Sequence, residues 1–157
     1  MAYSRSYNYS YSPKKPVKSF QDLEVYQKSL EASVFVAKIL VPAMGAKGKK
    51  KKAGQAASEL LIQALLPSAL GLPHSIAEAH SLRFGSGLEC LARLEKAMTT
   101  CNKLVAYIEQ ARDISETGIE WEKLDELIKK YFYIRRKVLN LQRSWKKFID
   151  LKKSEEN

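Results

Sequence analysis

The residues with the clearest chemical potential are the basic side chains in the last third of the chain. Between Leu127 and Ile149 the sequence has eight bases and no acid. Such a run can neutralise the phosphates of a nucleic acid or pair with the carboxylates of an acidic protein. A solvated helix face of ordinary composition mixes both signs, so this run predicts an anionic partner. The candidate nucleic-acid-binding residues are Lys129, Lys130, Arg135, Arg136, Lys137, Arg143, Lys146 and Lys147.

A second basic cluster lies in residues 43–54, where glycines flank five lysines. Four of these lysines are consecutive, and their mutual repulsion favours an open, solvated loop. The loop is either a solubilising linker or a finger that contacts phosphates. Its candidate phosphate-contacting residues are Lys49, Lys50, Lys51 and Lys52. Together, this loop and the helical run carry more positive charge than the net +10 of the whole chain, and this concentration of charge points to an anionic partner.

The residue types that usually carry catalysis form no catalytic pattern here. His74 and His80 are six residues apart, which places them on different faces of a helix and argues against a shared metal. The Glu-x-x-His pairs of di-metal bundles do not occur in the sequence. Cys90 and Cys101 would lie about 16 Å apart along a helix axis, too far for a disulfide. We therefore expect a reduced, cytoplasmic protein with no metal, no cofactor and no enzymatic activity.

The bases of the last third lie on a segment with a regular helical pattern, and a second segment has a similar pattern. The stretch from about residue 119 to 151 carries apolar residues at alternating steps of three and four, which is typical of a helix packed nearly parallel to its partners. These residues are Leu124, Leu127, Tyr131, Ile134, Val138, Leu141, Trp145 and Phe148. A similar pattern begins at Ser86, where Glu89 completes a capping box. It runs through Leu91, Leu94, Met98, Cys101, Val105 and Ile108.

The first half of the chain predicts two further helices. One begins at Ser19, where Asp22 completes a capping box, and ends at Pro42. Its inward residues are expected to be Leu23, Tyr26, Leu30, Val34, Ala37 and Val41. The other covers about residues 55–80, with a kink near Pro67 and a break or a fresh first turn at Pro73. Its most apolar run, residues 60–73, is too short to span a bilayer, so we expect no membrane partner.

Four such segments predict an all-α fold, namely an antiparallel four-helix bundle. The bundle is expected to cover residues 19–153 and to include the lysine-rich loop 43–54. Residues 1–18, rich in Tyr, Ser and Lys, are expected to form a disordered N-terminal tail. The tail is either a solvated extension or an arm whose tyrosines stack on bases.

Three short segments resemble a known family of four-helix bundles. Residues 19–28, Ser-Phe-Gln-Asp-Leu-Glu-Val-Tyr-Gln-Lys, resemble the opening of the proteins encoded in 23S ribosomal RNA intervening sequences. Residues 73–79 followed by Arg83 resemble that family's Ile-Ala-Glu-Gly segment, with Ala79 in place of the usual glycine. Residues 140–146, Asn-Leu-Gln-Arg-Ser-Trp-Lys, resemble the Trp-bearing basic end of the accessory variability determinant (Avd) of diversity-generating retroelements. The similarity covers about residues 19–150.

The resemblance implies a homopentamer that binds the retroelement's reverse transcriptase and its template RNA. Such a protein supports mutagenic cDNA synthesis without catalysing it. RNA is the expected nucleic acid, and DNA is a second candidate. By position, the resemblance implies contacts from Arg135, Arg136, Lys137, Arg143, Lys146 and Lys147. The alternative is an intervening-sequence-type bundle that acts as an oligomeric protein-interaction module with an acidic protein partner.

Overall fold

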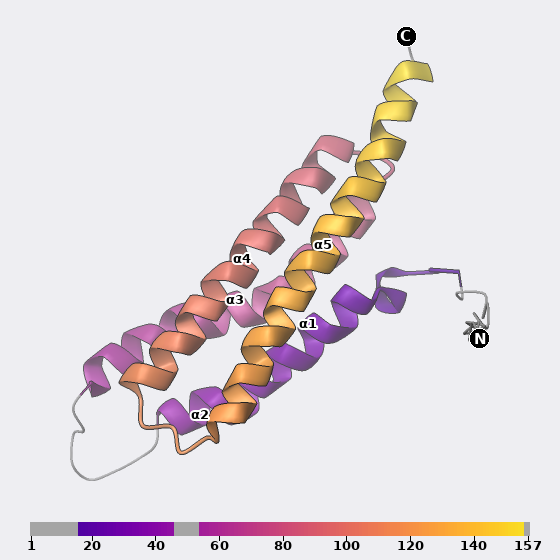
Figure 1. Ribbon diagram of the computed structural model, residues 1–157. Coiled ribbons are helices and arrows are strands. Elements are labelled where there is room, and N and C mark those ends of the chain that lie inside the picture. The colour runs from indigo at the N-terminus through magenta and orange to yellow at the C-terminus, as the bar shows by residue number, and fades with distance from the viewer. Residues whose placement is uncertain (1–15, 46–53, 156–157) are drawn as a thin grey trace, which may run out of the picture.

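The computed structural model describes residues 16–45 and 54–155, and every regular element in these ranges is a helix. Four long helical segments lie side by side (Figure 1), which confirms the predicted all-α bundle. The first segment follows the short helix η1 (Phe20–Asp22) and consists of α1 (Glu24–Phe35), η2 (Val36–Leu40) and α2 (Val41–Met44). The other three segments are the single helices α3 (Gln55–Leu82), α4 (Gly87–Ile114) and α5 (Trp121–Glu155). Most of the predicted tail and all the lysines of the predicted loop lie outside the described residues.

Each long segment packs against two neighbours. Helix α3 lies along α4, α4 lies along α5, and α1 contacts both α3 and α5. Residues 83–86 connect α3 to α4, and residues 115–120 connect α4 to α5. Connections this short make consecutive helices antiparallel, as Figure 1 shows. The last turns of α5 project beyond the other helices at the end where α3 turns into α4.

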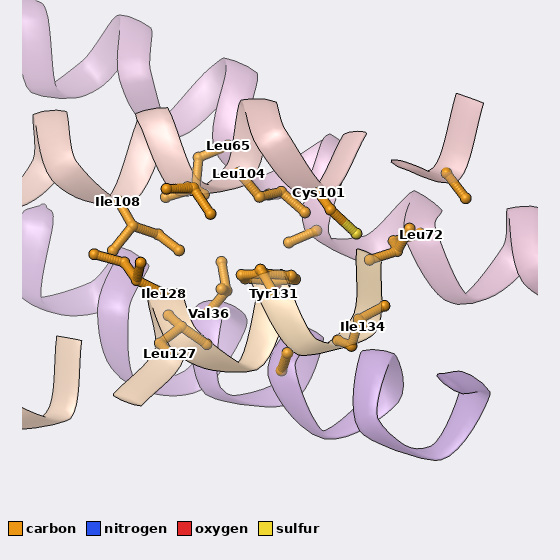
Figure 2. Packing of buried hydrophobic residues seen from close by; sticks show 14 of the residues in the cluster. Val36, Leu65, Leu72, Cys101, Leu104, Ile108, Leu127, Ile128, Tyr131 and Ile134 are labelled. Atoms are coloured by element: carbon orange, nitrogen blue, oxygen red, sulfur yellow. The ribbon is translucent and has the colours of Figure 1, made fainter. Parts of the chain in front are cut away.

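The inner faces of all four segments meet in one hydrophobic core. Tyr131 is fully buried near its centre and is surrounded by aliphatic side chains (Figure 2). Its labelled neighbours are Val36 from η2, Leu65 and Leu72 from α3, Cys101, Leu104 and Ile108 from α4, and Leu127, Ile128 and Ile134 from α5. Burying one such aliphatic side chain contributes about 1.5–3 kcal/mol, so this core is the main source of stability.

The predicted apolar seam of α5 is confirmed from Leu124 to Val138, where every seam residue is buried. Further along, Trp145 is half-buried, Phe148 is 65% exposed, and Ile149 is buried instead of Phe148. A seam that repeats every seven residues drifts by about 20° per heptad around a straight helix. Over three heptads this drift turns Phe148 outward. The seam predicted for α4 is also buried from Leu94 to Ile108.

The inward stripe predicted for the first helical segment is confirmed in part and wrong at Leu30 and Val34. Leu23 is buried, and Tyr26 and Val41 pack against the core. Leu30 and Val34 are 43% and 44% exposed. The buried face instead carries Val25, Ser29, Ala32, Ser33, Val36, Leu40 and Met44. The hydroxyls of Ser29 and Ser33 donate to the carbonyls of Tyr26 and Leu30, at 2.9 and 2.7 Å. Because these hydroxyls are satisfied within their own helix, small polar residues can occupy the buried face.

Prolines interrupt the helices less than the sequence predicts. The first helix does not end at Pro42, because the π-helical segment η2 changes the bonding pattern just before it. There the Val41 N–H donates to the Val36 carbonyl, five residues back, and the helix continues to Met44. Helix α3 likewise runs through Pro67 and Pro73 without a break. Packing against α1 and α4 compensates for the hydrogen bonds that the prolines remove.

The two predicted capping boxes have different outcomes. The box at Ser19 and Asp22 is present, but it caps η1 instead of α1. Ser86 is the N-cap residue of α4, yet its side chain makes no capping hydrogen bond.

Helix α3 is long and apolar enough to cross a membrane by length and composition alone. The run that looked too short in the sequence therefore lies within a helix of 28 residues. Of its most apolar window, 33% is buried inside the bundle. Leu65, Leu72 and Ile76 of this helix belong to the common core, and the core helix of a bundle meets the same criteria as a span.

Candidate nucleic-acid interface

Four of the predicted bases form a row on the outer face of α5, which we call the outer basic row: Lys129, Arg136, Arg143 and Lys147. The first three are seven residues apart, and seven residues make about two helical turns. Lys147 continues the row one turn further on. All four are exposed, on the side of α5 opposite the buried Tyr131. The row spans roughly 27 Å at 1.5 Å per residue.

Two of the eight predicted bases on α5 are paired with acids. Lys129 Nζ lies 2.8 Å from Asp125, and Lys130 Nζ lies 3.8 Å from Glu31 of α1. The hydrogen bond with Asp125 raises the pKa of Lys129. Within the described part of the chain, the other six have no acid within ion-pair distance. Exposed pairs contribute little, so a phosphate can replace Asp125 at small cost.

Arg135 is less available than the sequence predicts. It is half-buried at the contact between α5 and α4, and its Nε is buried with no hydrogen-bond partner in the described residues. The nearby Cys101 is buried in the core, as predicted. Burial raises the pKa of Cys101 to about 12, although the charge of Arg135 acts in the opposite direction. Cys101 is therefore a neutral, unreactive thiol, and Arg135 serves the packing of the bundle as much as its surface.

Tyr133 gathers three cations where α5 meets α1, and we call this group the Tyr133 cluster. Lys28, Arg136 and Lys137 place their charged groups 5.4, 5.5 and 5.3 Å from the centre of the Tyr133 ring. The Tyr133 hydroxyl donates to Glu24 Oε1 at 2.5 Å. This hydrogen bond raises the pKa of Tyr133, so the phenol stays neutral. The sequence does not single out Lys28, because it lies on a helix of mixed charge.

A groove of about 320 Å³ adjoins this cluster between α1 and α5. Its lining is largely polar on the α5 side. The lining residues are Leu23, Glu24 and Val25 before and at the start of α1, and Lys137, Asn140, Leu141 and Ser144 on α5.

Exposed aromatic residues gather at the projecting end of α5. Phe84 and Phe148 are 69% and 65% exposed. Together with Arg83 and Trp145 they line a cavity of about 150 Å³, which we call the aromatic pocket. The Arg83 guanidinium lies 4.2 Å from the centre of the Phe84 ring. The sequence pattern placed Trp145 and Phe148 on a core seam, and it did not mark Arg83 or Phe84 as binding residues.

His80 supports the aromatic pocket from inside the bundle. It is buried, and its ring meets that of Trp145 edge-on with the centroids 6.1 Å apart. Arg83 Nη1 donates to the His80 carbonyl at 2.5 Å and lies 3.1 Å from His80 Nδ1. Burial lowers the pKa of His80, and the charge of Arg83 adds to the effect. A neutral His80 can therefore accept a hydrogen bond from Arg83 and hold it in place.

The structure thus separates the predicted residues into groups. Lys129, Arg136, Arg143 and Lys147 share the outer face, Lys130 and Lys137 lie toward α1, and Arg135 lies against α4. Lys146 is exposed on the flank that also carries Gln142, whose amide bonds to Glu95 of α4 at 2.9 Å. The loop lysines Lys49, Lys50, Lys51 and Lys52 lie outside the described residues and stay predictions. Within the described ranges, no group of three His, Cys, Asp or Glu residues could hold a metal ion.

Comparisons with protein-family models, with curated proteins and with solved structures find no match to this chain.

Proposed function

We propose that this protein is a non-catalytic accessory protein of a diversity-generating retroelement, and that it binds nucleic acid and the reverse transcriptase through the basic surface of α5. The observation that carries the proposal is the outer basic row. Its four cations are exposed, share one face, and lie on a helix with no acid between Leu127 and Ile149. Neighbouring like charges such as Arg143 and Lys147 destabilise the helix that carries them, so a partner that offsets their repulsion is the simplest reason for the row.

The strength of such an interface follows from counterion release. Each phosphate contact contributes about 0.7 to the slope of log affinity against log salt for single strands, and about 0.9 for duplex DNA. Four contacts from the outer basic row would therefore give a slope of about −2.8 or −3.6. The Tyr133 cluster adds cations beside this row. RNA is the proposed nucleic acid, with DNA as the second candidate.

The retroelement part of the proposal is supported by the three segments that resemble the Avd group. The first of them forms the capped start of the first helical segment, and the last lies on α5 beside the outer basic row. The proposal includes a cytoplasmic location and a reverse transcriptase as the protein partner.

Exposed aliphatic residues support the homo-oligomer in this proposal. Residues 60–77 of α3 carry no Asp, Glu, Lys or Arg, yet Leu60 and Leu70 are 67% and 43% exposed. On the adjacent α1 segment, Leu30 and Val34 are similarly exposed. Exposed aliphatic residues on two helices that contact each other favour a protein–protein interface. We expect light scattering to give a homopentamer, the number of subunits that the resemblance implies, and Leu60→Lys with Leu70→Lys to yield smaller species.

The alternative is an oligomeric protein-interaction module whose basic face docks an acidic protein. Phe132, which is 51% exposed beside the outer basic row, favours it, because aromatic residues next to cations are enriched at protein interfaces. In that case Phe132→Ala would abolish capture of the protein partner and leave nucleic-acid binding unchanged.

The deciding experiment is a titration of the pure protein against fluorescent structured RNA, single-stranded DNA and duplex DNA over a range of salt concentrations. Affinity that falls with salt by the slopes above, with RNA preferred, supports the proposal. Absence of binding at low salt would overturn its nucleic-acid part. A pull-down with a candidate retroelement reverse transcriptase then tests the second partner, and failure to retain that enzyme would overturn the retroelement part.

A further inference from the structure

We propose that the aromatic pocket and the Tyr133 cluster form one binding track for a single-stranded polynucleotide, with an unpaired base stacked in the pocket and phosphates at the cluster. The inference rests on the proposed function, because it names the ligand class and its path on the same helix. It adds residues outside the predicted run of bases, namely Lys28, Arg83, Phe84 and Phe148.

The aromatic pocket suits the face of a base. Phe84 and Phe148 are 69% and 65% exposed, and the Arg83 guanidinium lies over the Phe84 ring. Aromatic rings and arginine planes are the surfaces on which unpaired bases stack in proteins that bind single strands. At about 150 Å³ the pocket is smaller than the roughly 300–1,000 Å³ that encloses a small molecule. A planar base that inserts one face matches this size, whereas bases in a duplex are already stacked on one another.

The pocket is held in place before any ligand binds. Trp145 rests against the buried His80, and Arg83 is tied to the His80 carbonyl. On the other side, α4 begins in close contact with α5, because a Cβ on Gly87 would lie only 2.8 Å from Ile149 Cγ1. Glycine at this position therefore lets α5 approach the connection that carries Phe84. A preformed platform lowers the ordering cost of binding.

The track continues along one flank of α5 toward α1. From Phe148 back to Lys137 is 11 residues, or roughly 16 Å along the helix axis. The groove that occupies this interval is lined on α5 by Lys137, Asn140 and Ser144, and on the α1 side its lining includes the acid Glu24. At its end the Tyr133 cluster presents three cations, and its one acid, Glu24, accepts the Tyr133 hydroxyl. The exposed Asp150 lies about 200° around the helix from Phe148, away from the track.

The test compares two single-stranded oligonucleotides of equal length, one with normal bases and one with abasic sites. Phe148→Ala and Phe84→Ala should each weaken binding of the normal oligonucleotide by about 5- to 150-fold. Binding of the abasic oligonucleotide should change less than twofold, and both salt slopes should stay as in the wild type. Phe132→Ala is the matched control, since it removes a similarly exposed ring from another face of α5. Phe148→Leu, which keeps apolar bulk, should lose stacking as well.

The phosphate end has its own test. Lys28→Gln with Lys137→Gln should reduce the salt slope by about 1.4 for both oligonucleotides, at about 0.7 per contact. In a Trp121→Phe background, Trp145 is the remaining tryptophan of the chain, and its fluorescence should be quenched by the normal oligonucleotide more than by the abasic one.

Three results would overturn the track. They are wild-type affinity in Phe148→Ala, an equal loss for both oligonucleotides, and quenching that is the same for both. The abasic oligonucleotide separates this inference from the proposed function. If wild-type protein binds it with normal salt dependence while the phenylalanine variants behave as wild type, the outer basic row remains and only the track fails. If wild-type protein binds neither oligonucleotide, the nucleic-acid function itself fails.

Discussion

Neutralising the outer basic row is the sharpest test of the electrostatic reasoning. The triple variant Arg136→Gln, Arg143→Gln and Lys147→Gln removes three of its four cations and keeps a polar, helix-compatible side chain at each position. For a single-stranded RNA the salt slope should fall in magnitude by about 2.1, at about 0.7 per lost contact. The wild-type protein should consequently lose about 20-fold more affinity than the variant when salt rises from about 50 to about 200 mM.

The variant should remain folded, so a loss of binding would not reflect a loss of structure. Arg143 and Lys147 are like charges four residues apart, and such pairs cost a helix about 0.2–0.5 kcal/mol. Removing them should leave the melting temperature unchanged or raise it. Circular dichroism during heating checks this before the binding assay.

The matched control removes the same net charge elsewhere. Lys38, Lys96 and Lys103 are exposed on the first helical segment and on α4. Their replacement by glutamine should change the slope by less than one. Fluorescence anisotropy with one labelled RNA at several salt concentrations gives both slopes. If the control lowers the slope as much as the α5 variant does, binding follows overall charge, and the outer basic row is not the interface.

Three further predictions concern the structure that holds this surface. The buried hydroxyl of Tyr131 has no hydrogen-bond partner in the described residues, so Tyr131→Phe should raise the free energy of unfolding by about 1–3 kcal/mol in urea denaturation; an unchanged or lower value would contradict this. Gly87→Ala should lower the free energy of unfolding by about 1–3 kcal/mol, because the new Cβ meets Ile149. The control Gly71→Ala places its Cβ in open space and should not destabilise the protein. Burial lowers the pKa of His80 below its ordinary value of 6.5, so the unfolded chain takes up this proton at higher pH than the folded one. The stability that neutral His80 contributes is therefore complete above about pH 6.5 and falls as the pH drops below that value. Between about pH 7.5 and 5.5, the melting temperature of the wild type should drop more than that of His80→Gln. Equal drops would show that His80 is not the group responsible.

The sequence by itself determined the helices and the inner faces of the last two. The spacing of Leu94, Cys101 and Ile108, and of Leu127, Tyr131 and Ile134, repeats at the period of a helix, and these residues are all buried. Such a pattern is local, because side chains three or four apart share a face whatever the helix packs against. The absence of acids between Leu127 and Ile149 is likewise visible in the sequence alone, and it indicated α5 as the basic element.

Only the tertiary structure decided which residues meet across helices. The buried face of α1 follows its contacts with α3 and α5, and its small serines bury because their hydroxyls bond within the helix. Phe84 and Phe148 are 64 positions apart, and they share a pocket because α3 turns into α4 beside the end of α5. Lys28 joins Tyr133 only through the packing of two helices. Contacts of this kind depend on how whole helices pack, and a periodic pattern within one helix holds no information about the position of another.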